Sequence, residues 1–202
     1  MAREFVTKVD LTDGLIRAYR AVMSTSTDTT TSATTSTETG EPGTHQRPAP
    51  RIDLPGLLPD FYQAMMRLEQ AAHGGLDPKL SELVRIRASQ LNGCAFCLDM
   101  HTKDARAGGE TEQRIYLLSA WRESEEFFSA KERAALALTE AVTLVSQTHV
   151  PDDVYAQAAQ EFEPAELAHL VAQIVAINSW NRLSITARNA PGYYQPRQQK
   201  TS

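Results

Sequence analysis

From Leu54 onward, apolar residues recur three and four positions apart almost without interruption. This spacing places them on one side of a helix, because an α-helix turns by about 100° per residue. No segment shows the alternation of apolar and polar residues that marks a half-buried strand. The sequence therefore predicts an all-α fold of about seven helices with short connections.

Capping signals locate the first of these helices. One is expected to begin near Leu58-Pro59-Asp60 and to stop at His73-Gly74-Gly75. The next should follow the N-cap and proline pair Asp77-Pro78 and end at Asn92-Gly93. The first helix carries its apolar face at the positions Phe61, Met65, Leu68 and Ala72.

Further helices are expected along the rest of the chain. Ser129 and Glu132 have the spacing of a capping box, and Val142 and Val145 belong to the apolar face that follows. The other expected helices are Cys94 to about Arg106, a segment carrying Ile115, Leu118 and Trp121, Pro151 to about Gln160, and Pro164 to about Leu183.

Both ends of the chain differ from this helical region. Residues 24–50 are rich in Ser and Thr and hold almost nothing apolar to bury, so disorder is expected there. Ahead of them, Phe5 to Met23 has the pattern of a short amphipathic helix. One hypothesis is that translation naturally starts at Met23. We expect a tail over residues 1–50, a helical domain over 51–192 and a C-terminal tail over 193–202.

The composition argues against two classes of partner. The 202 residues carry a formal net charge of −5, with Lys and Arg spread along the chain, which is not the basic footprint of a nucleic-acid-binding protein. No apolar run approaches the ~18 residues of a membrane span, and no apolar secretion signal opens the chain. We expect a cytoplasmic protein that binds neither nucleic acid nor membrane.

The two cysteines of the chain lie in the stretch NGCAFCLDMH. Cys94, Cys97 and His101 fall within roughly 60° of one another on a helix, so one face would carry both thiols and an imidazole. After the break at Asn92-Gly93, Cys94 would lie beside the helix N-terminus, where the thiolate is favoured. This arrangement suits reversible disulfide chemistry.

Two other interpretations of the pair stay open. A structural zinc site needs four ligands, whereas this stretch supplies at most three, and His73, His149 or His169 would have to complete it. Alternatively, both cysteines are small buried core residues. Activation of a thiol would call for an imidazole oriented by a carboxylate, but sequence distance alone does not bring Glu82 to His101.

The motif resembles that of the alkylhydroperoxidase D-like (AhpD-like) branch of the carboxymuconolactone decarboxylase superfamily. The residues that match are Glu82, eleven intervening residues, and then Cys94-x-x-Cys97-x-x-x-His101. Residues 119–143 and 175–183 are also similar to this branch, and the likeness covers roughly residues 54–192. Trp180, Asn181 and Arg182 lie in the second segment, where packing and pocket lining are equally open interpretations.

The resemblance implies an all-α fold that assembles into trimers or hexamers. It also implies a thiol peroxidase or disulfide reductase in which Cys97 attacks peroxide, Cys94 resolves the product, and His101 and Glu82 relay protons. No bound cofactor or metal is implied; an external dithiol, lipoyl-type or similar, would be the reductant. Phe96 replaces a histidine that well-studied members carry before the second cysteine, which removes one proton carrier.

Two other functions remain open for the same motif. The dithiol could serve a redox-responsive binding protein or carry electrons to a peroxiredoxin partner. The chain could also catalyse lactone decarboxylation, the superfamily's other namesake activity, which requires no cysteine pair.

Overall fold

The computed structural model describes residues 47–196. The chain divides into two units, Met1–Arg47 and Pro48–Ser202, and every helix described below belongs to the second. The expected helix over Phe5–Met23, the hypothesis of a start at Met23, and the Ser/Thr-rich run up to residue 46 lie outside the described residues.

The described region is built from helices, with no β-strand between residues 47 and 196, so the all-α prediction is confirmed. None of these helices combines the length and apolar character needed to cross a membrane. The α-helices are α2 (Leu54–Leu57), α3 (Pro59–Ala72), α4 (Pro78–Asn92), α5 (Ala95–Ala107), α6 (Glu112–Leu117), α7 (Ala130–Thr143), α8 (Val145–Thr148), α9 (Asp152–Glu161) and α10 (Pro164–Ala187). Two 3₁₀ helices, η1 (Leu118–Glu123) and η2 (Glu125–Phe127), link α6 to α7.

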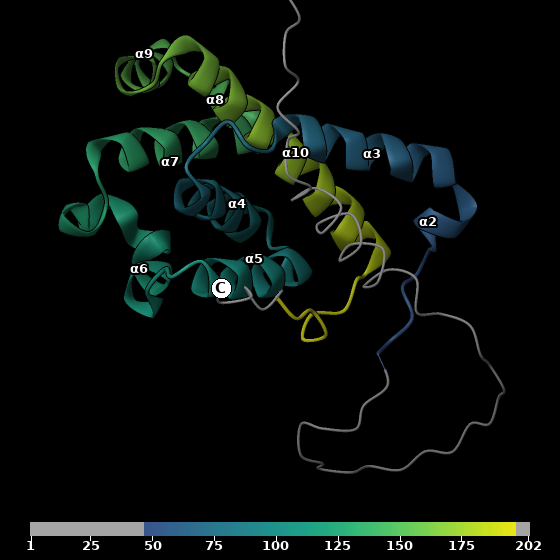
Figure 1. Cartoon of the computed structure of the whole chain (residues 1–202). Helices are drawn as coiled ribbons and strands as arrows, with labels where there is room; N and C mark the ends of the chain where they lie inside the picture. Colours follow the sequence, from purple (N-terminus) through teal and green to yellow (C-terminus); the bar gives the residue numbers. More distant parts are fainter. Residues whose placement is uncertain (1–46, 197–202) are drawn as a thin grey trace, which may run out of the picture. The chain divides into compact units, whose positions relative to one another are not determined.

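Helix α4 is the centre of the packing, because it contacts α5, α7 and α10 (Figure 1). Leu83 and Ile86 are fully buried in a core cluster that also holds residues of α5, α6, η1 and α7. Leu80 and Val84 belong to a second cluster with α7, α9 and α10. Since α5 packs on this central helix, the cysteine motif is held against the middle of the domain.

Two predicted apolar faces are corrected by the structure. On α3, Met65 and Ala72 are buried as predicted, but Phe61 is 44% exposed, and the helix also buries Tyr62, Met66 and the carboxylate Glu69. The spacing of apolar residues could not predict the burial of Glu69, because this carboxylate is buried through its ion pair with Arg85 of α4, described below. Val145 was predicted on the buried face of the helix after Ser129, but α7 ends at Thr143, and Val145 is 49% exposed in the separate turn α8.

The segment after α10 packs against α5. The Gly192 N–H donates to Asp99 Oδ2 (2.9 Å), and Lys103 Nζ donates to the Tyr194 carbonyl oxygen (2.9 Å). Tyr194 is only 5% exposed. The packed region therefore extends at least to Tyr194, into the first residues of the stretch expected to be a C-terminal tail.

Candidate active site

The first cysteine caps the helix that carries the second. Gly93 has a left-handed backbone (φ +70°) and ends α4, and Cys94 follows as the N-cap of α5. The Cys94 sulfur accepts a hydrogen bond from the Cys97 backbone N–H at 3.4 Å. Both thiols are free and buried, with exposed fractions of 1% for Cys94 and 0% for Cys97.

The two thiols differ in how easily they ionise. The Cys97 thiol donates a hydrogen bond to the Cys94 sulfur, and this lowers the pKa of Cys94 against the opposing effect of burial. The same bond raises the pKa of Cys97, as do burial and the charge on Cys94. Of the two thiols, Cys94 therefore ionises more readily than Cys97.

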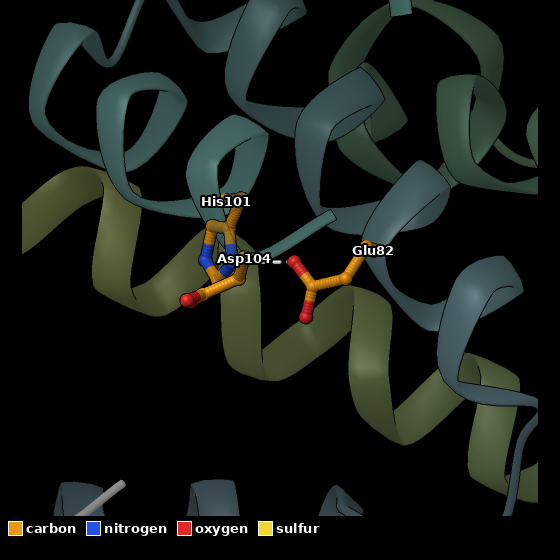
Figure 2. A group of neighbouring side chains, drawn as sticks. All are labelled: Glu82, His101 and Asp104. Atoms are coloured by element: carbon orange, nitrogen blue, oxygen red, sulfur yellow. Dashed lines mark hydrogen bonds and ion pairs between the residues drawn. The ribbon is translucent and has the colours of Figure 1, made fainter. Parts of the chain in front are cut away.

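Helix α4 brings Glu82 to the histidine on α5. Glu82 Oε2 and His101 Nδ1 are 2.9 Å apart, the contact that the resemblance implied but that sequence distance did not show (Figure 2). His101 lies one helical turn after Cys97, and its Nε2 is buried with no hydrogen-bond partner among the described residues. Because Nδ1 is bonded to the carboxylate, Nε2 is the nitrogen that can exchange a proton elsewhere.

A buried arginine fixes the other oxygen of Glu82. Arg85 Nη1 lies 2.5 Å from Glu82 Oε1, while Arg85 Nη2 lies 2.9 Å from Glu69 Oε1 and donates to Gln173 Oε1. Burial disfavours the Glu82 carboxylate, but Arg85 and His101 outweigh it and lower the Glu82 pKa to about 2. Glu82 is thus held charged and in one orientation.

Helix α10 supplies polar groups on the other side of the thiols. Asn181 is fully buried, donates to Ser89 Oγ (3.0 Å) and accepts from Asn92 Nδ2 (2.9 Å). Its amide is also a hydrogen-bond partner of both sulfur atoms. Trp180, by contrast, packs edge-on against Tyr62, so of the segment Trp180 to Arg182 it is Asn181 that reaches the thiols.

Asp104 completes a group of three ionisable side chains. One ligand atom each from Glu82, His101 and Asp104 lies within 4.8 Å of the others, which is close enough to surround a metal ion (Figure 2). Arg85 already contacts Glu82 Oε1, however, and Oε2 is bonded to His101 Nδ1, so neither Glu82 oxygen is free for a metal. The three side chains form a hydrogen-bonded Glu82–His101 pair with the Asp104 carboxylate beside it.

Part of this site was open to prediction and part was not. The spacing placed Cys94, Cys97 and His101 on one helix face, and the structure places all three on α5 or its cap. Arg85 and Asp104 were missed, although Arg85 lies three residues after Glu82 and Asp104 three residues after His101, a helical spacing that could have suggested both. Asn181 was singled out with packing and pocket lining both open, and the structure places its amide at the thiols.

The comparisons with known proteins agree with this architecture. Residues 59–141 match the carboxymuconolactone decarboxylase family. The uncharacterized protein YdfG of Bacillus subtilis is 44% identical over 140 residues, which cover 69% of this chain and 95% of the relative. The uncharacterized protein YnjA of Escherichia coli is 31% identical over 99 residues, which cover 49% of this chain and 53% of the relative.

Solved structures also resemble this chain in fold. A protein of unknown function from Agrobacterium tumefaciens, proposed to be the antioxidant defence protein AhpD, has a TM-score of 0.68 and 38% identity over 71% of this chain and 98% of its own. The debrominase Bmp8 has a TM-score of 0.60 at 18% identity over 69% of this chain and 75% of its own, which shows a shared fold alone. This chain belongs to the carboxymuconolactone decarboxylase and AhpD-like superfamily.

Proposed function

We propose that this protein is a thiol-dependent peroxidase in which the Cys94–Cys97 pair reduces a hydroperoxide and an external dithiol restores the pair. The observation that carries the proposal is the thiol pair itself: two free cysteines share a hydrogen bond at a helix N-terminus, next to the Glu82–His101 contact. Low thiol pKa and a nearby second thiol are what reversible oxidation requires.

The oxidation consists of two balanced steps. Cys97 gives its proton to His101, and its sulfur attacks one peroxide oxygen. The O–O bond breaks, the alkoxide takes up the proton to leave as an alcohol, and Cys97 becomes a sulfenic acid. The Cys94 thiol then gives up its proton and its sulfur attacks the Cys97 sulfur; the S–O bond breaks, a disulfide forms, and the hydroxide takes up that proton to leave as water. Two exchange steps with an external dithiol, lipoyl-type or similar, regenerate both thiols.

Two observations favour different attacking thiols. His101, with its unpartnered Nε2, lies one turn after Cys97, which supports Cys97 as the attacking sulfur. The hydrogen bond from Cys97 instead lowers the pKa of Cys94, which favours Cys94 as the more easily ionised thiol. We keep Cys97 as the attacking thiol because general-base assistance compensates for its raised pKa.

Trapping the first oxidation product tests both the activity and the order. The reduced protein, Cys94→Ser and Cys97→Ser are mixed with one equivalent of cumene hydroperoxide, and peroxide loss and intact mass are followed together. We expect rapid disulfide formation in the wild type, a trapped sulfenic acid in Cys94→Ser and no reaction in Cys97→Ser. The reverse pattern would assign the attack to Cys94.

Other outcomes would assign a different function. If peroxide persists while a dithiol still exchanges with the pair, the protein is a redox carrier, for example to a peroxiredoxin, or a redox-responsive binding protein. Lactone decarboxylation that survives in Cys97→Ser would support that enzyme class instead. The trimer or hexamer implied by the resemblance stays a prediction, which light scattering would check.

A further inference from the structure

Asp104 lies beside the proton relay but has no part in the mechanism above. It follows His101 on α5 by three residues, and Figure 2 shows its side chain beside the imidazole, close to Glu82 of α4. A carboxylate oxygen of Asp104 lies within 4.8 Å of a His101 ring nitrogen and of a Glu82 carboxylate oxygen. That separation is spanned by a direct contact or by one bridging water.

Glu82 is poorly suited to carry a proton onward. Both of its oxygens are occupied, Oε1 by Arg85 and Oε2 by His101. With a pKa of about 2, it stays ionised at neutral pH, so it accepts the bond from His101 Nδ1 and orients the imidazole. A group that passes a proton between His101 and the solvent must be a different one.

Asp104 differs from Glu82 in the direction of its pKa shift. It is partly exposed, whereas His101 is buried. Burial raises the pKa of Asp104, the Tyr194 hydrogen bond lowers it in part, and the nearby Glu82 carboxylate raises it. A carboxyl group whose pKa is raised toward the operating pH is a more effective proton carrier than one held ionised.

The C-terminal segment holds Asp104 in place. The Tyr194 hydroxyl donates to Asp104 Oδ1 at 2.6 Å, and the buried Tyr194 is anchored through its carbonyl oxygen by Lys103. The titratable and charged groups that face Asp104 are therefore Glu82 and Arg85 on α4, His101 on its own helix, and Tyr194 on the C-terminal segment.

We propose that Asp104 is a positioning and proton-relay residue that passes protons between His101 and solvent, and that Tyr194 holds its carboxyl group at the imidazole. The inference rests on the proposed thiol chemistry of the pair. During reduction of the disulfide, Cys97 leaves as a thiolate and takes a proton from His101, which regains one from Asp104; Asp104 is then reprotonated by solvent. The electrons come from the external dithiol, so the step balances.

The test measures the two half-reactions separately across pH 4.5 to 8 in the full chain. The first half-reaction is disulfide formation with cumene hydroperoxide. For the second, the disulfide is made with diamide and then reduced by dithiothreitol, which needs no peroxidase activity. We expect Asp104→Asn to slow both by about tenfold, with partial recovery in added acetate, because a small carboxylic acid can replace the missing proton carrier. One acid-side ionisation should also disappear from the pH profile.

Two further variants separate a relay from a structural contribution. Tyr194→Phe removes the bond that lowers the Asp104 pKa, so the acid-side ionisation should move to higher pH. Asp99→Asn is the matched control, because Asp99 is another α5 carboxylate bonded to the C-terminal segment, through Gly192, and should leave both profiles unchanged. If circular dichroism shows that Asp104→Asn does not fold, the shift of the acid-side ionisation in Tyr194→Phe tests the inference instead.

The outcomes distinguish the two proposals. Wild-type rates, an unchanged pH profile and no acetate effect in Asp104→Asn would overturn the relay inference, whatever the peroxide result. If the wild type does not react with peroxide but dithiothreitol reduction still depends on Asp104, the peroxidase proposal fails and the relay inference stands.

Discussion

At the scale of single residues, the charge of Glu82 couples the site to stability. Its pKa is depressed from 4.5 to about 2 in the folded chain. A depressed carboxyl pKa contributes stability above the unfolded value and loses it as pH falls toward the folded value. We therefore expect the free energy of unfolding to fall by about 3 kcal/mol between roughly pH 5 and pH 2 from this group.

Urea denaturation at pH 3 and pH 7 measures this dependence. Glu82→Gln should be less stable than the wild type at pH 7. Its free energy of unfolding should also differ much less between pH 3 and pH 7 than that of the wild type. Glu112→Gln is the control, because the Glu112–Arg106 pair is exposed and such pairs contribute about 1 kcal/mol or less. Equal pH dependence in wild type and Glu82→Gln would contradict the assignment.

The ionisation of Cys94 depends on a donor supplied by Cys97. Cys97→Ser keeps an O–H donor at that position, whereas Cys97→Ala removes it. We expect the Cys94 pKa to be higher in Cys97→Ala than in Cys97→Ser, because the hydrogen bond from Cys97 is the largest influence that lowers it. Thiolate absorbance at 240 nm, titrated in both variants, gives the comparison; identical curves would show that the shared hydrogen bond does not set the pKa.

What the sequence revealed at this scale was limited to residues on one helix. Cys94, Cys97 and His101 follow from a single period of 3.6, so their common face was predictable. The contact between Glu82 and His101 depends on how α4 packs on α5, and only the family resemblance indicated it. Glu69 and Arg85 look like surface residues in the sequence, because their burial depends on a partner from another helix.

At the scale of elements, the junction between α4 and α5 sets the direction in which the thiols point. Gly93 adopts φ +70°, a conformation that costs a residue with a side chain roughly 1–2 kcal/mol, and a Cβ there would meet no atom within 4 Å. We expect Gly93→Ala to lose about 1 kcal/mol of unfolding free energy from backbone strain alone.

Gly108→Ala is the matched control for this substitution. Gly108 ends α5 with φ −78°, which is an ordinary backbone conformation, so it should lose much less stability. Urea denaturation of the two variants compares the strain, and the rate of disulfide formation shows whether the junction also positions Cys94. A larger loss in Gly108→Ala than in Gly93→Ala would refute the argument.

The helix boundaries show which local signals are sufficient. Asp77 caps α4 and Ser129 forms its capping box with Glu132 as expected, because these signals act within one turn. The 3₁₀ helix Leu118–Glu123 and the turn α8 were not predicted. Leu118 and Trp121 are buried there although the chain leaves α-helical geometry, so the side-chain pattern alone did not show the change.

At the scale of the whole molecule, burial of the thiols limits which reductants can reach them. Cys94 is 1% exposed and Cys97 is fully buried. A reagent too large for the closed core therefore needs the domain to open locally before it can meet either sulfur. Cys94 and Cys97 should therefore be modified by a bulky disulfide reagent only through local opening.

The rate of modification measures that opening. In the reduced wild type, we expect a bulky aromatic disulfide to react about a hundredfold more slowly than with Ala107→Cys in a Cys94→Ser/Cys97→Ser background, because Ala107 is exposed. Low urea should accelerate the buried thiols and leave the exposed one unchanged, since denaturant favours states that expose more surface. If the buried pair reacts as fast as the exposed cysteine, the native chain already admits large reductants, and the step that limits re-reduction must be the exchange chemistry itself.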